Sequence, residues 1–107
     1  GEEIVPLKDE VVDQFYQGRA QVIANRKYGF VDEKGKEIVP LKYDDALSFA
    51  EGRARVMVNR KFGYIDLSGK EVIPCQYDQG TYFKDGKTKV SKEGRTFYIN
   101  TAGKEVQ

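Results

Sequence analysis

Two adjacent acidic residues, Asp44 and Asp45, are the first side chains in this sequence that could perform acid–base chemistry. Catalysis by paired carboxylates needs both groups to face one substrate. Neighbouring residues of a strand point to opposite faces, however, and 34 residues further on the same place holds Asp78 and Gln79. We therefore expect these acids to lie in solvated turns or to accept hydrogen bonds from the backbone.

Few residues in this sequence could act as nucleophiles or metal ligands. The chain has one cysteine, Cys75, and no histidine, which excludes a Cys–His pair and the usual zinc sites. The segment Gly69-Lys70-Glu71 resembles a phosphate loop only superficially, because it lacks the strand, glycine-rich loop and helix context. We expect Cys75 to be a packing residue beside Pro74. The sequence thus predicts a protein that is not an enzyme and uses no cofactor or metal.

Aromatic and basic side chains are the remaining candidates for a binding site. The candidate binding residues are Tyr28, Phe30, Phe62, Tyr64, Tyr98, Arg19, Arg53 and Arg55. The rings could stack on sugars or bases, and together with basic residues they could bind single-stranded nucleic acid. We favour core packing for the rings, because a small domain needs their buried area. For the basic column of Arg19, Arg53 and Lys87 we favour a solvated rim.

The charge balance argues against polyanionic partners. The 107 residues include 18 basic and 17 acidic side chains, which gives a net charge of +1. Such a balance provides no field that would attract nucleic acid or an anionic membrane. No apolar run approaches the length of a membrane span, so we predict neither nucleic-acid binding nor membrane insertion.

An internal repeat of 34 residues organises the sequence. Residues 1–34 match residues 35–68 at 17 positions. The three prolines occupy one place in the repeat: Pro6, Pro40 and Pro74. Periodicity of this kind indicates a tandem array of one supersecondary unit. We divide the single repeat domain, residues 1–107, into units of approximately 1–34, 35–68 and 69–107.

The alternation of side chains identifies the repeat as β rather than helical. Residues 53–58 and 61–66 both alternate, and Asn59-Arg60 between them has the composition of a tight turn. A two-residue loop predicts these facing pairs: Ala54–Ile65, Arg55–Tyr64, Val56–Gly63, Met57–Phe62 and Val58–Lys61. A longer loop is the alternative, since Arg60 in a left-handed conformation would be strained.

A second turn and a short strand follow each hairpin. Asp66 can cap a type I turn, and Gly69 supplies the left-handed residue after it. We predict a strand over residues 71–73 that stops, or lies at a sheet edge, at Pro74, which has no N–H to donate. Residues 75–85 are interpreted as a loop or a short irregular strand.

The segments that connect one unit to the next, and the last unit itself, both depart from the alternating pattern of the hairpin strands. Tyr43 and Phe49, with their equivalents in other units, are expected to fill the gap between adjacent units. In the last copy the lysine-rich residues 87–92 replace the apolar strand. A terminal unit needs a polar outer surface, so we interpret this copy as a cap, with sequence drift as the alternative.

We therefore predict an all-β fold of three tandem 34-residue β-hairpin units, stacked as an open twisted ribbon or solenoid. A small closed β-barrel is the alternative. Each unit needs its neighbour to cover its apolar face. Gly18, Gly52 and Gly86 should then have equivalent backbone environments.

One motif recurs through the chain: an aromatic–glycine strand at residues 61–66, then Gly-Lys-Glu-Val-Ile-Pro at residues 69–74, then Tyr77-Asp78. In this motif the sequence resembles the bacterial WG repeat family. The usual Trp of the family is replaced by Tyr28, Phe62 and Thr96. The Gly after it becomes Phe97 in the last copy, which puts the packing of that unit in question. The resemblance implies an all-β repeat array in a bacterial protein, without shared catalytic residues.

For function, the sequence predicts a non-enzymatic repeat module that mediates protein–protein interaction or acts as a structural scaffold. The alternative is a carbohydrate- or cell-wall-binding module that uses exposed aromatic rings, by analogy with other aromatic hairpin repeats. We slightly favour a cell-envelope or secreted location over the cytoplasm. The exposure of Phe62 and Tyr64 discriminates between the two functions, because burial of both rings would remove the platform for a sugar.

Overall fold

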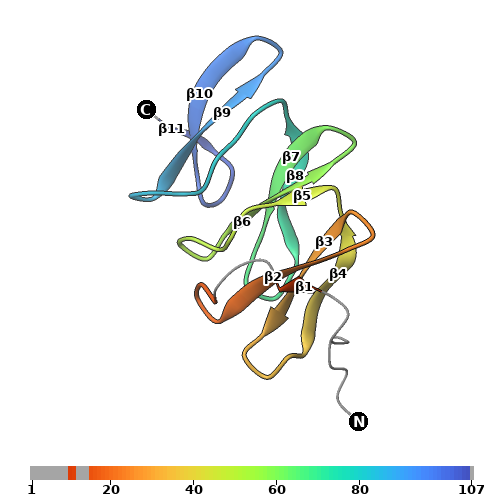
Figure 1. Cartoon of the computed structure of the whole chain (residues 1–107). Helices are drawn as coiled ribbons and strands as arrows, with labels where there is room; N and C mark the ends of the chain where they lie inside the picture. The colour runs from red at the N-terminus through yellow and green to blue at the C-terminus, as the bar shows by residue number, and fades with distance from the viewer. Residues whose placement is uncertain (1–9, 12–14, 107) are drawn as a thin grey trace.

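The computed structural model describes residues 10–11 and 15–106 of the chain. These residues form strands and turns without any helix, in three antiparallel β-sheets (Figure 1). The all-β prediction is therefore confirmed. Pro6, the first of the three repeated prolines, lies outside the described residues.

Each sheet is built around one hairpin. The first sheet contains β1 (Glu10–Val11), β2 (Arg19–Ala24), β3 (Lys27–Asp32) and β4 (Glu37–Tyr43), in that order. The middle sheet contains β5 (Asp45–Ala46), β6 (Ala54–Val58), β7 (Lys61–Ile65) and β8 (Glu71–Tyr77). The third sheet contains β9 (Lys87–Lys92), β10 (Arg95–Asn100) and β11 (Glu105–Val106). The hairpins β2–β3, β6–β7 and β9–β10 are the alternating segments of the sequence.

The turn of each hairpin contains two residues of positive φ. Asn25 and Arg26 have φ values of 52° and 66°, and Asn59 and Arg60 have values of 52° and 67°. Positive φ at both positions is the type I′ geometry, whose twist matches that of the strands it joins. The two-residue loop is confirmed, and the strained arginine conformation is the cost of this match.

The register of the middle hairpin is the predicted one. The pairs are Ala54–Ile65, Arg55–Tyr64, Val56–Gly63, Met57–Phe62 and Val58–Lys61. Small aliphatic side chains therefore line one face of this hairpin, and rings with a basic neighbour line the other.

The third strand of the middle sheet runs further than the sequence predicted. β8 continues past Pro74 to Tyr77 instead of ending at Ile73. Its pairing with β7 shifts between Ile73 and Tyr77, so residues 74–76 form a bulge opposite one residue of β7. Pro74 lies in this bulge on an edge strand, where pairing does not require its missing N–H. The predicted sheet edge is confirmed, and the predicted strand end is wrong.

The bulge explains the glycine of the aromatic–glycine motif. A side chain at Gly63 would place its Cβ atom 2.5 Å from the carbonyl oxygen of Ile73 and 2.6 Å from the amide nitrogen of Cys75. Gly29 lies against β4 in the same way, 2.5 Å from the carbonyl oxygen of Val39. These neighbours are all backbone atoms, so only glycine lets the third strand cross this closely.

The second turn has the predicted geometry. The Oδ1 atom of Asp66 accepts hydrogen bonds from the backbone N–H groups of Ser68 and Lys70, at 2.9 and 3.0 Å. Gly69 follows with a φ of 89° and donates its N–H to the carbonyl oxygen of Asp66. The same turn recurs between β3 and β4 and between β10 and β11.

Another two-residue turn, which the sequence patterns did not predict, precedes each hairpin. Gly18, Gly52 and Gly86 have φ values of 78°, 76° and 81°, and each follows a residue that also has positive φ. The residues on either side of each turn form an antiparallel bridge. The three glycines therefore occupy equivalent backbone environments, as the repeat predicts.

The apolar core lies between the sheets. The cluster between the first and middle sheets contains Phe30, Val39, Tyr43, Ala46, Phe49, Ala54, Val56 and Ile65. The cluster between the middle and third sheets contains Tyr64, Ile73, Tyr77, Phe83, Val90 and Ile99. In both, rings of one sheet meet the aliphatic face of the next. Tyr43, Phe49, Tyr77 and Phe83 fill the gaps between units, as predicted, whereas Phe15, the equivalent of Phe49 in the first unit, is exposed.

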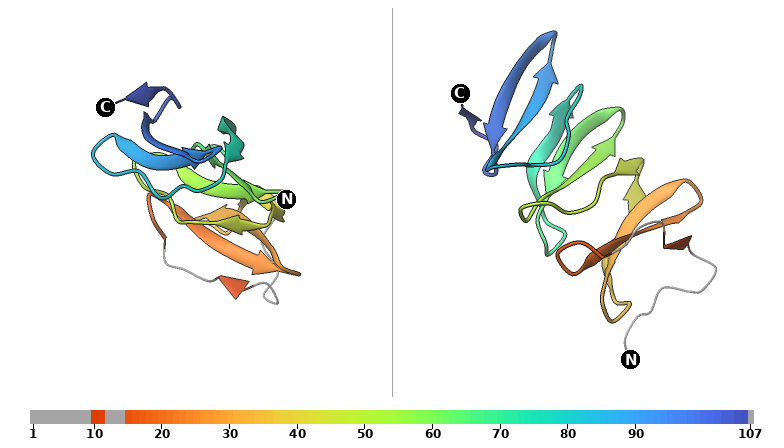
Figure 2. Two further views of the ribbon diagram at one scale, coloured as in Figure 1. Left: turned by 90° about the horizontal axis from the view of Figure 1, so that it is seen from above. Right: turned by 60° about the vertical axis from the view of Figure 1, so that its left-hand side comes forward.

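The sheets follow one another along the long axis of the molecule (Figure 2). The molecule measures 45 × 25 × 20 Å along its principal axes. In the described part of the chain, the first and third sheets do not pair with each other. The predicted open repeat array is therefore confirmed, and these strands do not close into a barrel.

Candidate functional site

The predicted binding rings lie at different depths. Phe30 and Tyr64 are fully buried, and each meets a phenylalanine edge-on with ring centroids 4.9 Å apart. Tyr28 and Phe62 are half-buried, and the guanidinium of Arg55 lies 4.3 Å from the centre of the Phe62 ring. Core packing is confirmed for Phe30 and Tyr64. Of the two rings that could have formed a sugar platform, Tyr64 is therefore buried in the core, and Phe62 is covered by Arg55.

Arg19 and Arg53 connect neighbouring sheets. The Nε atom of Arg19 donates a hydrogen bond to the carbonyl oxygen of Leu67, and that of Arg53 donates to the carbonyl oxygen of Thr101, both at 2.9 Å. Both side chains are half-buried. The expectation of a solvated rim is therefore wrong for these two residues, because each guanidinium reaches a turn of the next sheet.

Tyr98 is the predicted ring that remains exposed. Its side chain is 39% exposed, whereas Phe30 and Tyr64, at the equivalent positions, are 0% exposed. Lys87, the last member of the basic column, places its Nζ atom 4.8 Å from the centre of the Tyr98 ring. The structure thus does not bring the predicted residues together in one site. They are divided among the core, the steps between sheets and the third sheet.

Asp44 and its equivalent Asp78 hold turns in place, whereas Asp45 lies in β5 and pairs with Arg55. Asp44 pairs with Lys27 and accepts a hydrogen bond from the backbone N–H of Asn59 at 3.2 Å. Asp78 pairs with Lys61 and accepts a bond from the equivalent turn of the third sheet. The lysine hydrogen bond, followed by that backbone bond, holds the pKa of each carboxyl below its usual range. Both groups are therefore charged structural acceptors, as expected.

Cys75 is a poor nucleophile. Its side chain is half-buried and packs against the core cluster between the first and middle sheets. Burial, reinforced by the carboxylate of Glu71, raises the pKa of the thiol to about 11. Because the thiolate is the reactive form, this cysteine is a packing residue.

A groove beside the loops that precede the hairpins presents two tyrosines that sequence reasoning missed. It has a volume of about 350 Å³ and is lined by Tyr16, Gln21, Leu47, Ser48, Phe49, Ala50 and Tyr82. Tyr16 is 42% exposed and Tyr82 is 55% exposed. Gln21 is buried, and its amide donates a hydrogen bond to the hydroxyl of Ser48 at 3.2 Å. The three stacked sheets bring these loop residues together.

A departure from the repeat could have revealed both tyrosines. Tyr16 corresponds to Ala50 and Lys84, and Tyr82 corresponds to Ser48. The core rings Phe30 and Tyr64, by contrast, hold the same place in neighbouring units. An aromatic residue found at its place in one unit alone lacks this repeated packing, and this is the signal that Tyr16 and Tyr82 carry.

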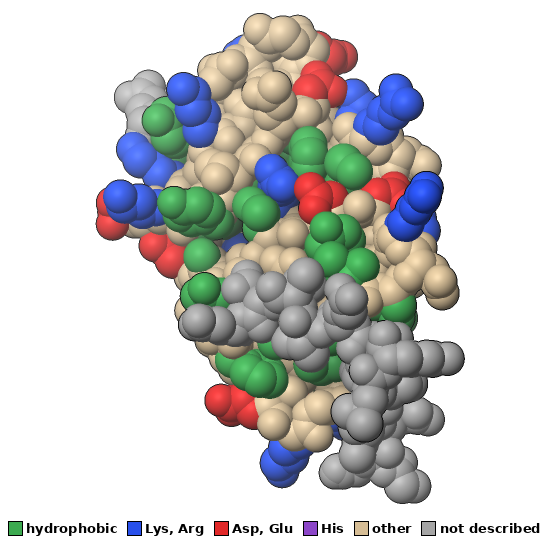
Figure 3. All heavy atoms as spheres, viewed as in Figure 1, with side chains coloured by type: hydrophobic (Ala, Val, Ile, Leu, Met, Phe, Trp, Pro, Cys, Tyr) green, Lys and Arg blue, Asp and Glu red, His purple; other side chains and the backbone are tan. Residues whose placement is uncertain are grey.

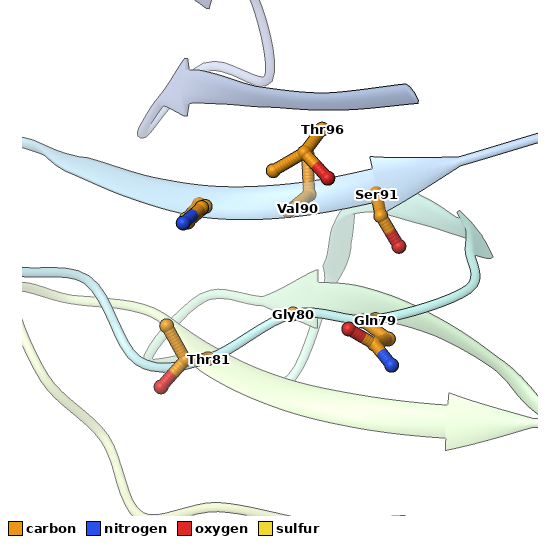
Figure 4. A pocket seen from close by; sticks show the side chains of 7 residues that line it. Gln79, Gly80, Thr81, Val90, Ser91 and Thr96 are labelled. Atoms are coloured by element: carbon orange, nitrogen blue, oxygen red, sulfur yellow. The ribbon is translucent and has the colours of Figure 1, made fainter. Parts of the chain in front are cut away.

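A second hollow lies between strand β9 and residues 79–81 of the segment that joins β8 to β9 (Figure 4). It has a volume of about 340 Å³ and is lined by Gln79, Gly80, Thr81, Lys89, Val90, Ser91 and Thr96. In the middle sheet this place is taken by strand β5, whereas here Gln79 forms only an isolated bridge with Ser91. Lys89 is the one ionisable side chain in this lining, so the hollow holds no acid–base pair.

Charge and metal ligands point to no further site. On the face seen in Figure 3, basic and acidic side chains are interspersed with hydrophobic ones. Within residues 10–11 and 15–106, no cluster of three or more Cys, Asp or Glu side chains could hold a metal ion. The same residues contain no helix that is long and apolar enough to cross a membrane.

The comparisons with known proteins concern the repeat itself. No curated protein and no solved structure matches the chain significantly. The family model described as WG containing repeat matches residues 28–62 and 62–95, which together span more than half of the chain. Both matches begin at the aromatic residue before the glycine that the third strand crosses. The chain belongs to the WG containing repeat family.

Proposed function

We propose that this protein is a non-enzymatic repeat module that binds another protein through the groove between Tyr16 and Tyr82. The observation that carries the proposal is the exposure of these two rings on one groove of about 350 Å³. Tyrosine is favoured in protein interfaces, because its ring provides apolar area while its hydroxyl can still form a hydrogen bond.

The lining of the groove supports a protein partner over a charged ligand. Leu47, Phe49 and Ala50 supply apolar surface, Gln21 and Ser48 supply a polar pair, and no side chain in the lining is charged. Aromatic enrichment with depletion of charge is the composition found at the centre of protein interfaces.

The repeat array supports a scaffold role, because it fixes the spacing of the groove residues. Tyr16 precedes β2, residues 47–50 precede β6, and Tyr82 precedes β9. The binding of a partner that touches both tyrosines therefore depends on how all three sheets stack. Such a surface is assembled before binding, which lowers the ordering cost of association.

A pull-down with a matched pair of variants tests the proposal. The immobilised protein is exposed to a lysate of its source organism, washed at moderate salt, and the retained proteins are identified by mass spectrometry. The double variant Tyr16→Ser/Tyr82→Ser should retain the partner about tenfold less, as expected when an interface loses two tyrosines. Tyr98→Ser removes an exposed ring that does not line this groove, and it should behave as the wild type. Absence of any partner at moderate salt, or equal retention by the double variant, would contradict the proposal.

A carbohydrate is the second candidate ligand, because two exposed tyrosine rings on one groove can stack on sugar rings. This hypothesis now rests on Tyr16 and Tyr82 in place of Phe62 and Tyr64. Titration with soluble cell-wall oligosaccharides, followed by NMR, should shift the amide signals of residues 47–50 if it holds. Unchanged signals at millimolar sugar would remove this candidate and leave the protein-binding proposal in place.

A further inference from the structure

Two ring pairs join the sheets in the same way. Phe30 meets Phe49, and Tyr64 meets Phe83, both edge-on with centroids 4.9 Å apart. In each pair the first ring belongs to a hairpin strand of one sheet. The second ring belongs to the loop that leads into the hairpin of the next sheet. The chain therefore makes one type of contact twice.

The two ends of the array expose the two halves of this contact. Phe15 holds the place of Phe49 and Phe83, and it is 46% exposed where they are 3% and 2% exposed. Tyr98 holds the place of the strand rings, which are fully buried, and it is exposed. The first sheet thus presents the loop ring, and the third sheet presents the strand ring.

Polar groups around the ring pair show the same complementarity. The Oε1 atom of Gln17 accepts a hydrogen bond from the N–H of Gly52 at 2.7 Å, and Glu51 accepts equivalent bonds from the next turn. Asp85 continues this series and presents a carboxylate at the third sheet. Gly18 carries the matching N–H at the first sheet.

The basic column adds a third matching group. Its two arginines donate to carbonyl oxygens in the turns after β7 and β10. Lys87 holds the arginine place in the third sheet, and Glu33 lies in the matching turn after β3. The side chain of Glu33 is exposed, so its carboxylate is available to the lysine ammonium.

Phe97 prevents the third sheet from being completed as the other two are. Gly29 and Gly63 hold this place in the first two sheets, where the third strand crosses 2.5 Å from the Cβ position. In the third sheet the Phe97 ring packs edge-on against Tyr77, with centroids 6.2 Å apart. A third strand could therefore not cross β10 as closely as β4 crosses β3 and β8 crosses β7, and the Tyr98 ring is exposed in the structure.

We propose that a second copy of this chain docks head to tail, with Phe15 of one copy packed on Tyr98 of the other. The contact joins two different patches and reproduces the ring pair and the turn contacts of the step between sheets, so it can extend into a chain of molecules. Ala20 and Val22, on the aliphatic face of the first sheet, are already buried in one copy. The contact between copies therefore uses the ring pair and the turns, and self-association is weak and reversible.

Sedimentation equilibrium of the purified chain, from micromolar to millimolar concentration, tests this proposal. The average mass of the wild type should rise with concentration. Phe15→Ser and Tyr98→Ser should each remain monomeric, because each removes one half of the ring pair. Lys70→Ser, which removes an exposed side chain from the turn after β7 in the middle sheet, should associate as the wild type does.

Mixing the two monomeric variants gives the sharpest result. Phe15→Ser retains Tyr98, and Tyr98→Ser retains Phe15, so the mixture should form a one-to-one dimer that grows no further. Both replaced side chains are exposed, and circular dichroism checks that the variants keep the fold. A constant monomer mass for the wild type would overturn the proposal. Association of Phe15→Ser alone would also overturn it, since that indicates a symmetric contact through Tyr98. Failure here leaves the groove beside Tyr82 untouched, because a different variant tests that groove.

Discussion

Replacing Gly63 by alanine tests whether the close third strand is the reason for the aromatic–glycine motif. The new Cβ atom would lie 2.5 Å from the oxygen of Ile73, 2.6 Å from the nitrogen of Cys75 and 2.7 Å from the carbonyl carbon of Pro74. Ordinary contact begins near 3.4 Å. These neighbours are backbone atoms, which cannot rotate away as the end of a flexible side chain can. β7 and β8 must therefore separate by about 0.9 Å at the closest point.

The separation should be costly because both strands contribute to the core. Tyr64 and Ile73 flank the bulge and belong to the cluster between the middle and third sheets. Overpacking of a close-packed interior costs about 1–3 kcal/mol. Loosening the edge-on contact of Tyr64 with Phe83 adds about 1 kcal/mol. We expect Gly63→Ala to lower the free energy of unfolding by about 3 kcal/mol, a large fraction of the total for a small domain.

Urea unfolding followed by circular dichroism measures this loss, with Gly52→Ala as the matched control. Gly52 has a φ of 76°, but its Cβ position has nothing within 4 Å. Alanine at this position should lower the free energy of unfolding only through its left-handed backbone conformation, by about 1–2 kcal/mol. The Gly63 variant should therefore unfold at a clearly lower urea concentration than the Gly52 variant. A Gly63→Ala loss equal to or smaller than that of the control would refute the steric explanation.

Four further experiments test individual side chains. Tyr43→Phe should leave stability in urea unchanged or higher, because its buried hydroxyl has no hydrogen-bond partner in the described part of the chain. Tyr64→Phe should lose about 1 kcal/mol together with its hydroxyl hydrogen bond of 2.6 Å. Cys75 should be alkylated at neutral pH only after unfolding, as followed by mass spectrometry, because burial raises its pKa to about 11. The hydrogen bond from Lys61 lowers the pKa of Asp78, so its stabilisation is present above the unfolded value of 3.8 and is lost as pH falls through the lower folded pKa. Asp78→Asn should therefore flatten the acid side of a thermal-unfolding profile. Equal losses for the two tyrosine variants, native-state alkylation, or an unchanged acid profile would contradict these expectations.

The hairpins were predictable because their determinants are local. Alternation over residues 53–58 and 61–66 sets which side chains share a face, and a two-residue turn then sets the register. Asp66 and Gly69 define the next turn through hydrogen bonds within the turn itself. Even Arg60 takes a positive φ against its own preference, because the twist of the flanking strands requires it.

The third strand and the groove were not predictable because they depend on contacts between distant parts of the chain. Pro74 signals the end of a strand, yet a bulge allows β8 to continue. Arg19 and Arg53 donate hydrogen bonds to carbonyl groups 48 residues away. The sequence around each arginine does not distinguish such a residue from a cation exposed to solvent. Tyr16 and Tyr82 meet at one groove only after three sheets are stacked.

Among residues 10–11 and 15–106, the side-chain hydrogen bonds described between sheets connect immediate neighbours. Gln17 and Arg19 bind the middle sheet and its turns, and Glu51 and Arg53 bind the third. A tensile load along the 45 Å axis is therefore borne in series, one junction after another. Under such a load the molecule should lengthen in discrete steps, and the middle sheet, anchored on two sides, should exchange its amide protons last.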